Sequence, residues 1–167
     1  MMDLSFRSQQ AWGEILLRWW RGLADDTGGR AALRRAGDLT AVVMAPAYQR
    51  LYRRLRAAGW PDAPWQNDRL AAAAGLLAHV READERSLPA AMSQRVGDKP
   101  CVSPLRFRRL LESPDVDTLF TGLRRTLPLL QHRAEPLTLA NDVVAWGDAV
   151  RKRWAYDYEW PEQKAAA

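Results

Sequence analysis

The stretch Leu70-Ala-Ala-Ala-Ala-Gly-Leu-Leu-Ala-His-Val80 indicates how this chain folds. Alanine has the highest helix propensity, and its small side chain permits neighbouring helices to pack closely. The stretch therefore predicts a helix from Leu70 to about Glu82, opened by Asn67 or Asp68.

Helical patterns continue on both sides of this stretch. Apolar residues recur at helical spacing, and strand-like alternation is nearly absent apart from the short β-branched run Ala41–Met44. The other predicted helices follow a Ser8 cap to about Leu23 and then run over about 30–36, 38–45, 48–58, 87–97, 103–112, 116–130 and 138–154. We expect an all-α protein, a compact helical bundle of about 7–9 helices.

The chain length of 167 residues suits one domain or two small lobes that share a core. Asp98–Ser103 is the best candidate for a linker. We therefore predict a single helical domain over 1–160, with lobes at about 1–97 and 104–160, and a C-terminal tail over 161–167.

Cysteine content and hydropathy indicate the compartment. Cys101 is the single cysteine, so an internal disulfide is impossible and a reducing cytosol is expected. The N-terminus has no apolar signal core, and no run approaches the ~20 apolar residues of a membrane span. These features predict a soluble, cytoplasmic protein that does not engage a membrane.

Arginine dominates the basic residues: it accounts for 22 of 25, and the net charge is +5 with a pI near 9.9. Between Arg30 and Arg56 there are seven arginines and one acid, Asp38. The guanidinium group holds phosphate with a planar fork of several donors, whereas lysine offers a point charge. This composition favours an acidic partner, and nucleic acid is the commonest one.

The arginines gather in four clusters set among apolar residues. The clusters are Arg30–Arg35, Arg50–Arg56, Arg106–Arg109 and Arg124–Arg125. Each cluster alone is compatible with a solvated face that pairs with Asp and Glu. Four clusters with few acids nearby favour a surface that binds a polyanion.

The eight tryptophans leave a choice between packing and recognition. Five of them fall at helical core spacing, which favours packing. Trp60 and Trp65 lie in an expected loop, where sealing the core and stacking on a base are both open. Trp160 could anchor a partner protein.

No constellation of catalytic or metal-binding residues stands out. His79 and His132 lack metal-ligand spacing, and Cys101 has no nearby histidine to activate it. Asp25–Asp26 and Asp115–Asp117 stand at helix ends, where acids cap the backbone and complement the helix dipole. We expect no enzyme activity, no metal and no cofactor.

Four segments occur in an order that is similar to a known family. They are Trp19-Trp-x-x-Leu23, Arg30-Ala-x-Leu-Arg34-Arg35-Ala36, Val102-Ser-Pro-Leu-Arg106-Phe-Arg108-Arg109-Leu110-Leu111, and Leu123-Arg124-Arg125-x-Leu127-Pro-Leu129-Leu130. The array resembles the CasB small-subunit family of the type I-E CRISPR surveillance complex, Cascade, over roughly residues 10–155.

The resemblance implies a helical, non-catalytic subunit that stabilises the guide RNA–target hybrid and the displaced non-target DNA strand in antiviral defence. The implied partners are CRISPR RNA, target DNA, the large and backbone subunits of Cascade and a second copy of the chain. The residues implied by the matching motifs are Arg30, Arg34, Arg35, Arg106, Arg108, Arg109, Arg124 and Arg125. Arg53 and Arg54 join this set on their charge pattern alone.

Two other functions remain open at this stage. In a helix-turn-helix regulator, the helix at Arg30–Arg35 or Arg106–Leu111 would enter a major groove. Neither helix is expected to be followed by a tight turn and a second helix. In a pure assembly protein, the arginines would pair with acidic surfaces of protein partners.

Overall fold

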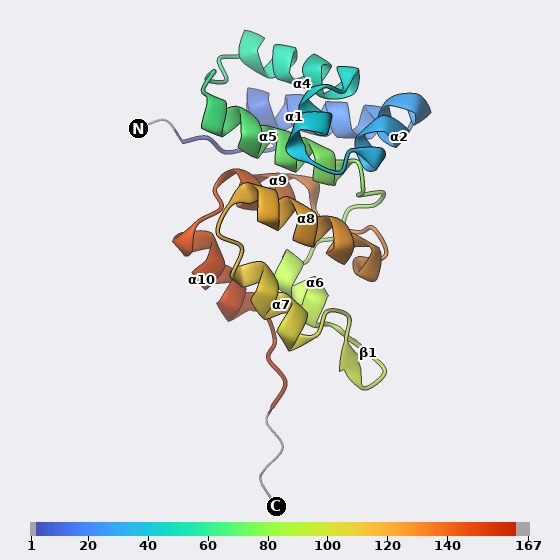
Figure 1. Ribbon diagram of the computed structural model, residues 1–167, viewed down its shortest axis with the longest axis vertical. Coiled ribbons are helices and arrows are strands. Elements are labelled where there is room, and N and C mark those ends of the chain that lie inside the picture. The colour runs from blue at the N-terminus through green and yellow to red at the C-terminus, as the bar shows by residue number, and fades with distance from the viewer. Residues whose placement is uncertain (1–2, 163–167) are drawn as a thin grey trace, which may run out of the picture.

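The computed structural model describes residues 3–162, and regular structure in this part of the chain is almost entirely helical (Figure 1). The predicted all-α class is confirmed, and the ten α-helices in the described residues slightly exceed the predicted 7–9. The α-helices are α1 Ala11–Gly22, α2 Thr27–Arg35, α3 Leu39–Val43, α4 Pro46–Ala57, α5 Pro64–Leu77, α6 Leu88–Ser93, α7 Pro104–Leu111, α8 Val116–Thr126, α9 Pro136–Val144 and α10 Asp148–Asp157. A 3-10 helix, η1 Leu127–Leu130, and a hairpin of β1 Arg95–Val96 and β2 Lys99–Pro100 complete the elements.

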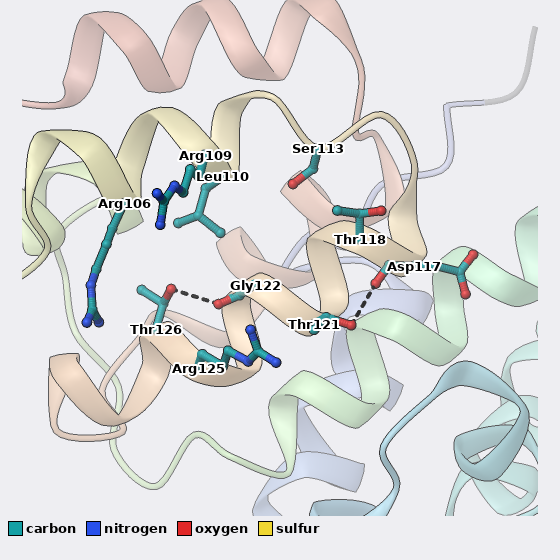
Figure 2. A pocket seen from close by; sticks show the side chains of 10 residues that line it. All are labelled: Arg106, Arg109, Leu110, Ser113, Asp117, Thr118, Thr121, Gly122, Arg125 and Thr126. Carbon is teal, nitrogen blue, oxygen red and sulfur yellow. Dashed lines mark hydrogen bonds between the residues drawn. The ribbon is translucent and has the colours of Figure 1, made fainter.

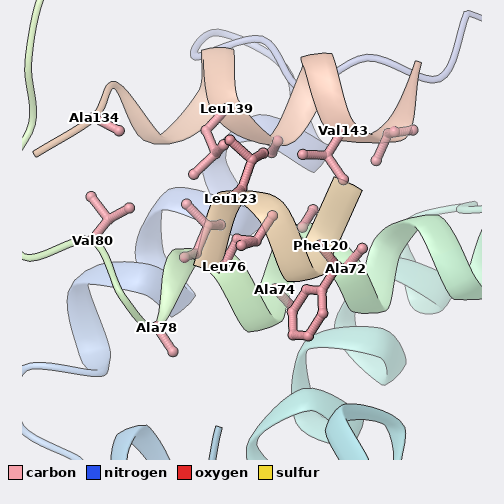
Figure 3. Packing of buried hydrophobic residues seen from close by; sticks show 14 of the residues in the cluster. Ala72, Ala74, Leu76, Ala78, Val80, Phe120, Leu123, Ala134, Leu139 and Val143 are labelled. Carbon is pink, nitrogen blue, oxygen red and sulfur yellow. The ribbon is translucent and has the colours of Figure 1, made fainter. Parts of the chain in front are cut away.

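Helix α5 forms the centre of the core. Every residue from Leu70 to Val80 is buried, as expected for a helix that is apolar around its whole circumference. Helices α3, α8 and α9 pack around it, and Figure 3 shows side chains of α8 and α9 meeting those of α5.

Helices approach one another closely in this core at Gly75. A β-carbon added there would lie 2.8 Å from Cε2 of Phe120 in α8 and 2.9 Å from Cγ2 of Val42 in α3. Glycine therefore lets three helices meet at one point, although it lowers helix propensity by about 1 kcal/mol relative to alanine.

The remaining helices lie on two sides of this centre. Figure 1 places α1, α2 and α4 with α5 in the upper part, and α6, α7 and α10 in the lower part. Helix α5 contacts helices from both sides of residues 98–103. The lobe boundary itself stays a prediction, and residues 163–167 of the predicted tail lie outside the described residues.

Three helix starts agree with the sequence. The side chains of Asp38, Ser103 and Asp115 each accept a hydrogen bond from a backbone N–H three residues later, at 2.8, 3.3 and 2.8 Å. The predicted helix starts at about 38, 103 and 116 are confirmed, because an N-cap depends only on residues close in sequence.

Other boundaries differ from the sequence prediction in the first half of the chain. The predicted Ser8 cap is wrong, since α1 begins at Ala11 after Gln10. Helix α2 begins at Thr27, and Asp26 caps it by accepting from the Gly29 amide at 3.0 Å. Gly28 and Gly29 therefore lie in the first turn of α2, ahead of the predicted start at residue 30.

Helix α5 is also displaced from its predicted bounds: it runs from Pro64 to Leu77. Trp65 consequently lies in its first turn and is exposed, with the Arg69 guanidinium 5.9 Å from its ring centroid. Trp60 is fully buried and stacks on Phe6, with ring centroids 5.0 Å apart. Packing, and not base stacking, is therefore its role.

The second half departs from prediction in two places. Residues after Ser93 form the β1–β2 hairpin, turning at Gly97 with φ of 67°, where a helix to Gly97 and a linker were predicted. The predicted helix 138–154 is two helices, because α9 ends at Val144 and α10 begins at Asp148. The indole of Trp146 there turns into the core and donates to the Ser113 carbonyl at 3.0 Å.

Within residues 3–162, no helix combines the length and apolar character needed to cross a membrane.

Candidate nucleic-acid interface

A groove of about 630 Å³ separates α7 from α8. Figure 2 shows Arg106 and Arg109 extending from α7 and Arg125 from α8 along its walls. The structure thus brings together predicted site residues from two segments that lie about fifteen positions apart in the sequence. None of these three arginines forms an ion pair with a residue in 3–162.

Packing on the opposite side of α7 sets the direction of its arginines. Phe107 is fully buried and stacks on Tyr158, with ring centroids 4.1 Å apart. The Tyr158 hydroxyl donates to the Val102 carbonyl at 2.6 Å, just before α7 begins. Because Phe107 points inward, Arg106 and Arg109 are left on the exposed side of the helix, where they line the groove.

Hydroxyl groups line the α8 wall beside Arg125. Thr118 and Thr121 share its helix face at spacings of seven and four residues, and this spacing is the signal that could have found them in the sequence. The Thr121 hydroxyl donates to the Asp117 carbonyl at 3.2 Å, and its lone pairs stay available.

The groove has a basic and an acidic end. Among residues 3–162, Asp117 is the only acid that lines it, and Figure 2 places it far from Arg106. Burial, followed by the charges of Asp115, Asp68 and Asp38, raises the pKa of Asp117. The two ends therefore differ in charge, and an anion would be drawn to the arginine end.

The side chains of Arg30 and Arg124 help to hold the fold. The Arg30 guanidinium donates to the carbonyls of Ala78 at 3.1 Å and Val80 at 3.4 Å, at the end of α5. Arg124 donates through Nη2 to the Arg34 carbonyl at 2.9 Å and so joins α8 to α2. These contacts explain why the side chains of Arg30 and Arg124 are only partly exposed.

Arg35, Arg53, Arg54 and Arg108 are exposed and do not line the α7–α8 groove. None of them has an ion-pair partner in the described part of the chain. Arg53 and Arg54 lie on α4, which Figure 1 places at the upper edge, away from α7 and α8. The structure therefore does not bring all ten predicted arginines to one site.

His79 lies in the middle of this basic region. It is buried, and its Nε2 atom has no hydrogen-bond partner among the described residues. Burial is the main cause that lowers its pKa to about 4, and the charges of Arg124, Arg34, His132 and Arg30 add to the effect. His79 is therefore neutral near pH 7.

Residues considered for catalysis have structural contacts. Asp26 caps α2 and pairs with Arg50 at 3.0 Å, and Asp115 caps α8. His132 places Nδ1 2.9 Å from the His79 carbonyl. Across residues 3–162, no group of three or more His, Cys, Asp or Glu residues is arranged to hold a metal ion.

The fold and the groove define a class: an arginine-rich, all-helical protein with a basic groove between two short helices. The chain belongs to the CRISPR-associated protein Cse2 family, whose model matches residues 29–158. Cse2 is the same family as CasB, so the predicted resemblance is confirmed.

A solved structure has a similar fold. It is a chain in the crystal structure of E. coli Cascade bound to a PAM-containing dsDNA target with a 32-nt spacer. The two chains superpose with a TM-score of 0.62 at 23% sequence identity, over 87% of this chain and 92% of that one. No curated protein sequence matches this chain.

Proposed function

We propose that this chain is the non-catalytic small subunit of a type I-E Cascade complex and that it holds nucleic-acid backbone in the α7–α8 groove. The observation that supports this function is the convergence of Arg106, Arg109 and Arg125, without an acidic partner in residues 3–162, on one groove. Family membership supports the Cascade role.

The chemistry of the groove suits phosphate and not base edges. Guanidinium forks bind phosphate oxygens with two parallel hydrogen bonds, and threonine hydroxyls can add neutral ones. No Asn or Gln is among the groove-lining residues of the described chain, and these are the side chains that read adenine. We therefore propose binding that is independent of sequence.

Such contacts can matter in a guide-directed complex. The RNA–DNA hybrid is about as stable as the DNA duplex that it replaces, so a few phosphate contacts can shift the balance. We propose that the groove contributes these contacts by holding the displaced non-target strand or the guide–target hybrid. CRISPR RNA, target DNA, the other Cascade subunits and a second copy of the chain are the partners in this proposal.

The sequence predicted no tight turn and second helix after Arg106–Leu111. That prediction is wrong, because only four residues, 112–115, join α7 to α8. The side chains nevertheless argue against that function. Arg106 and Arg109 of α7 share one groove with Arg125 of α8, whereas a recognition helix places the side chains of a single helix in the major groove. We therefore propose Arg106, Arg109 and Arg125 as the main contact, with Arg34, Arg35, Arg108 and Arg124 around it.

The test replaces Arg106, Arg109 and Arg125 by Gln together. Affinity for single-stranded DNA should fall about tenfold to a hundredfold near 0.1 M salt, equally for unrelated sequences. The slope of log K against log salt should flatten by about 2, because each lost single-strand phosphate contact contributes about 0.7. Fluorescence anisotropy across a salt series measures both quantities.

A matched control replaces Arg18, Lys99 and Lys152 by Gln. These residues are exposed, form no ion pair within residues 3–162, and lie outside the groove, so the variant loses the same charge. Equal losses in the two variants would mean that net charge, and not the groove, carries binding. No loss in the groove variant would contradict the proposed function.

A further inference from the structure

A second basic pocket, of about 210 Å³, lies where α1, the start of α2 and the end of α5 meet. Its walls include Trp20 and Arg21 from α1, Arg30 from α2, and Val80 and Arg81 from the chain after α5. Arg21 and Arg81 were not among the predicted site residues. In the part of the chain that the structure describes, none of the residues that line this pocket is acidic.

The wall of this pocket is held in place by hydrogen bonds to one carbonyl. The Val80 carbonyl accepts from the Trp20 indole at 3.0 Å and from Nη2 of Arg30 at 3.4 Å. Arg30 also donates to the Ala78 carbonyl at 3.1 Å. The half-buried Arg30 is therefore fixed, and a ligand would find its guanidinium already oriented.

Two further guanidinium groups border the same space. Arg21 and Arg81 are exposed and have no ion-pair partner in the described residues. Arg30 lies close enough to Arg81 and Arg34 for their charges to add to burial in lowering its pKa. Three like charges around one small pocket repel one another, and a bound anion relieves that repulsion.

Basic residues connect this pocket to the α7–α8 groove. Arg34 follows Arg30 by one helical turn in α2, and its carbonyl accepts from Arg124 of α8 at 2.9 Å. The next residue, Arg125, lines the groove. A polyanion that leaves the groove at Arg125 thus meets Arg124 and Arg34 before it reaches Arg30 and Arg81.

We propose that this pocket binds a phosphate group of the same nucleic-acid strand that the α7–α8 groove holds. The inference rests on the proposed function and extends it, because one chain would then grip a strand at two separated points. Arg21 and Arg81 supply the adjustable contacts, and Arg30 supplies the fixed one.

The test is a variant with Arg21→Gln and Arg81→Gln, which leaves the structural Arg30 intact. Its control, Lys99→Gln with Lys152→Gln, loses the same charge outside the pocket. Each is titrated with oligothymidylate of about 6 and about 30 nucleotides, since single-strand sites commonly span 4–16 nucleotides. Unchanged thermal unfolding confirms that both variants fold.

For the long strand, the pocket variant should bind about fivefold to tenfold more weakly than the control. Its salt slope should be flatter by about 1.4, from two lost phosphate contacts. The short strand should bind both variants alike, because the groove alone accommodates it. The second probe is inorganic phosphate, and its binding is measured by the shifts of the backbone amide resonances of Arg21 and Arg81.

Three outcomes would overturn the inference. If the groove variant binds weakly and the pocket variant binds the long strand like its control, the pocket is not a strand site, and the proposed function stands. If neither variant is weakened, both proposals fail. If inorganic phosphate shifts the two amides but the long strand binds the pocket variant normally, the pocket holds free phosphate only.

Discussion

Replacing Gly75 by alanine tests how closely the helices pack at the centre of the fold. The added β-carbon would lie 2.8 Å from Phe120 Cε2 and 2.9 Å from Val42 Cγ2, well inside the optimal carbon–carbon separation of about 3.5–4.0 Å. Both neighbours are buried, and the β-branched Val42 has little rotamer freedom. Helix α3 or α8 must therefore move away from α5.

Two opposing effects set the expected magnitude. Overpacking a core costs about 1–3 kcal/mol. Alanine in a helix interior gains about 0.5–1 kcal/mol over glycine. Because the contact involves two helices at once, we expect overpacking to win and the variant to lose about 1–2 kcal/mol of unfolding free energy.

Urea denaturation followed by circular dichroism measures this change, and Tm should fall by roughly 2–8 °C. Gly28→Ala in α2 is the control, because an added β-carbon there has no atom within 4 Å. That variant should be unchanged or slightly more stable. A Gly75→Ala variant as stable as Gly28→Ala would refute the close packing described here.

Two further predictions concern the basic region. The pKa of His79 is lowered from 6.5 to about 4, mainly by burial, so the unfolded chain binds the proton more tightly than the folded protein. The free energy that neutral His79 contributes to folding is therefore complete above pH 6.5 and is lost as the pH falls from 6.5 to 4. After allowance for solvent screening the loss is about 2 kcal/mol, and denaturation of His79→Gln across this range should show a shallower decline. Arg30→Gln removes the hydrogen bonds to Ala78 and Val80 and should lower the free energy of unfolding by about 1–3 kcal/mol. Arg35→Gln, at an exposed position in the same helix, should change it by less than about 0.5 kcal/mol. Chemical denaturation measures both values, and equal stabilities of the two variants would contradict a structural role for Arg30.

The sequence predicts best those features that depend on neighbouring residues. Ser103 with Pro104, and the caps Asp38 and Asp115, mark helix starts because capping needs only a side chain and an amide three residues later. The sequence does not predict the end of α9 at Val144, because a distant contact is involved. The Trp146 indole donates a hydrogen bond to the carbonyl of Ser113, thirty-three positions earlier. The hairpin at 95–100 is too short for its alternation to stand out.

The candidate site shows the same limit. Arginine clustering identifies residues that could meet a polyanion, but helix rotation decides which of them do so. Phe107 turns Arg106 and Arg109 toward α8, while Arg30 lies against the end of α5. Arg81 carried no signal in the sequence because it stands outside every cluster.

The all-round burial of α5 has a consequence for any strand that the protein binds. Since α2 and α8 both contact α5, the arginines on these two helices cannot change their separation without disturbing the core. The backbone of the protein therefore contributes little to the ordering entropy of binding, which falls on the flexible strand and on the exposed arginine side chains. A strand already extended and anchored at both ends should lose less freedom than a free one, and so should bind more tightly.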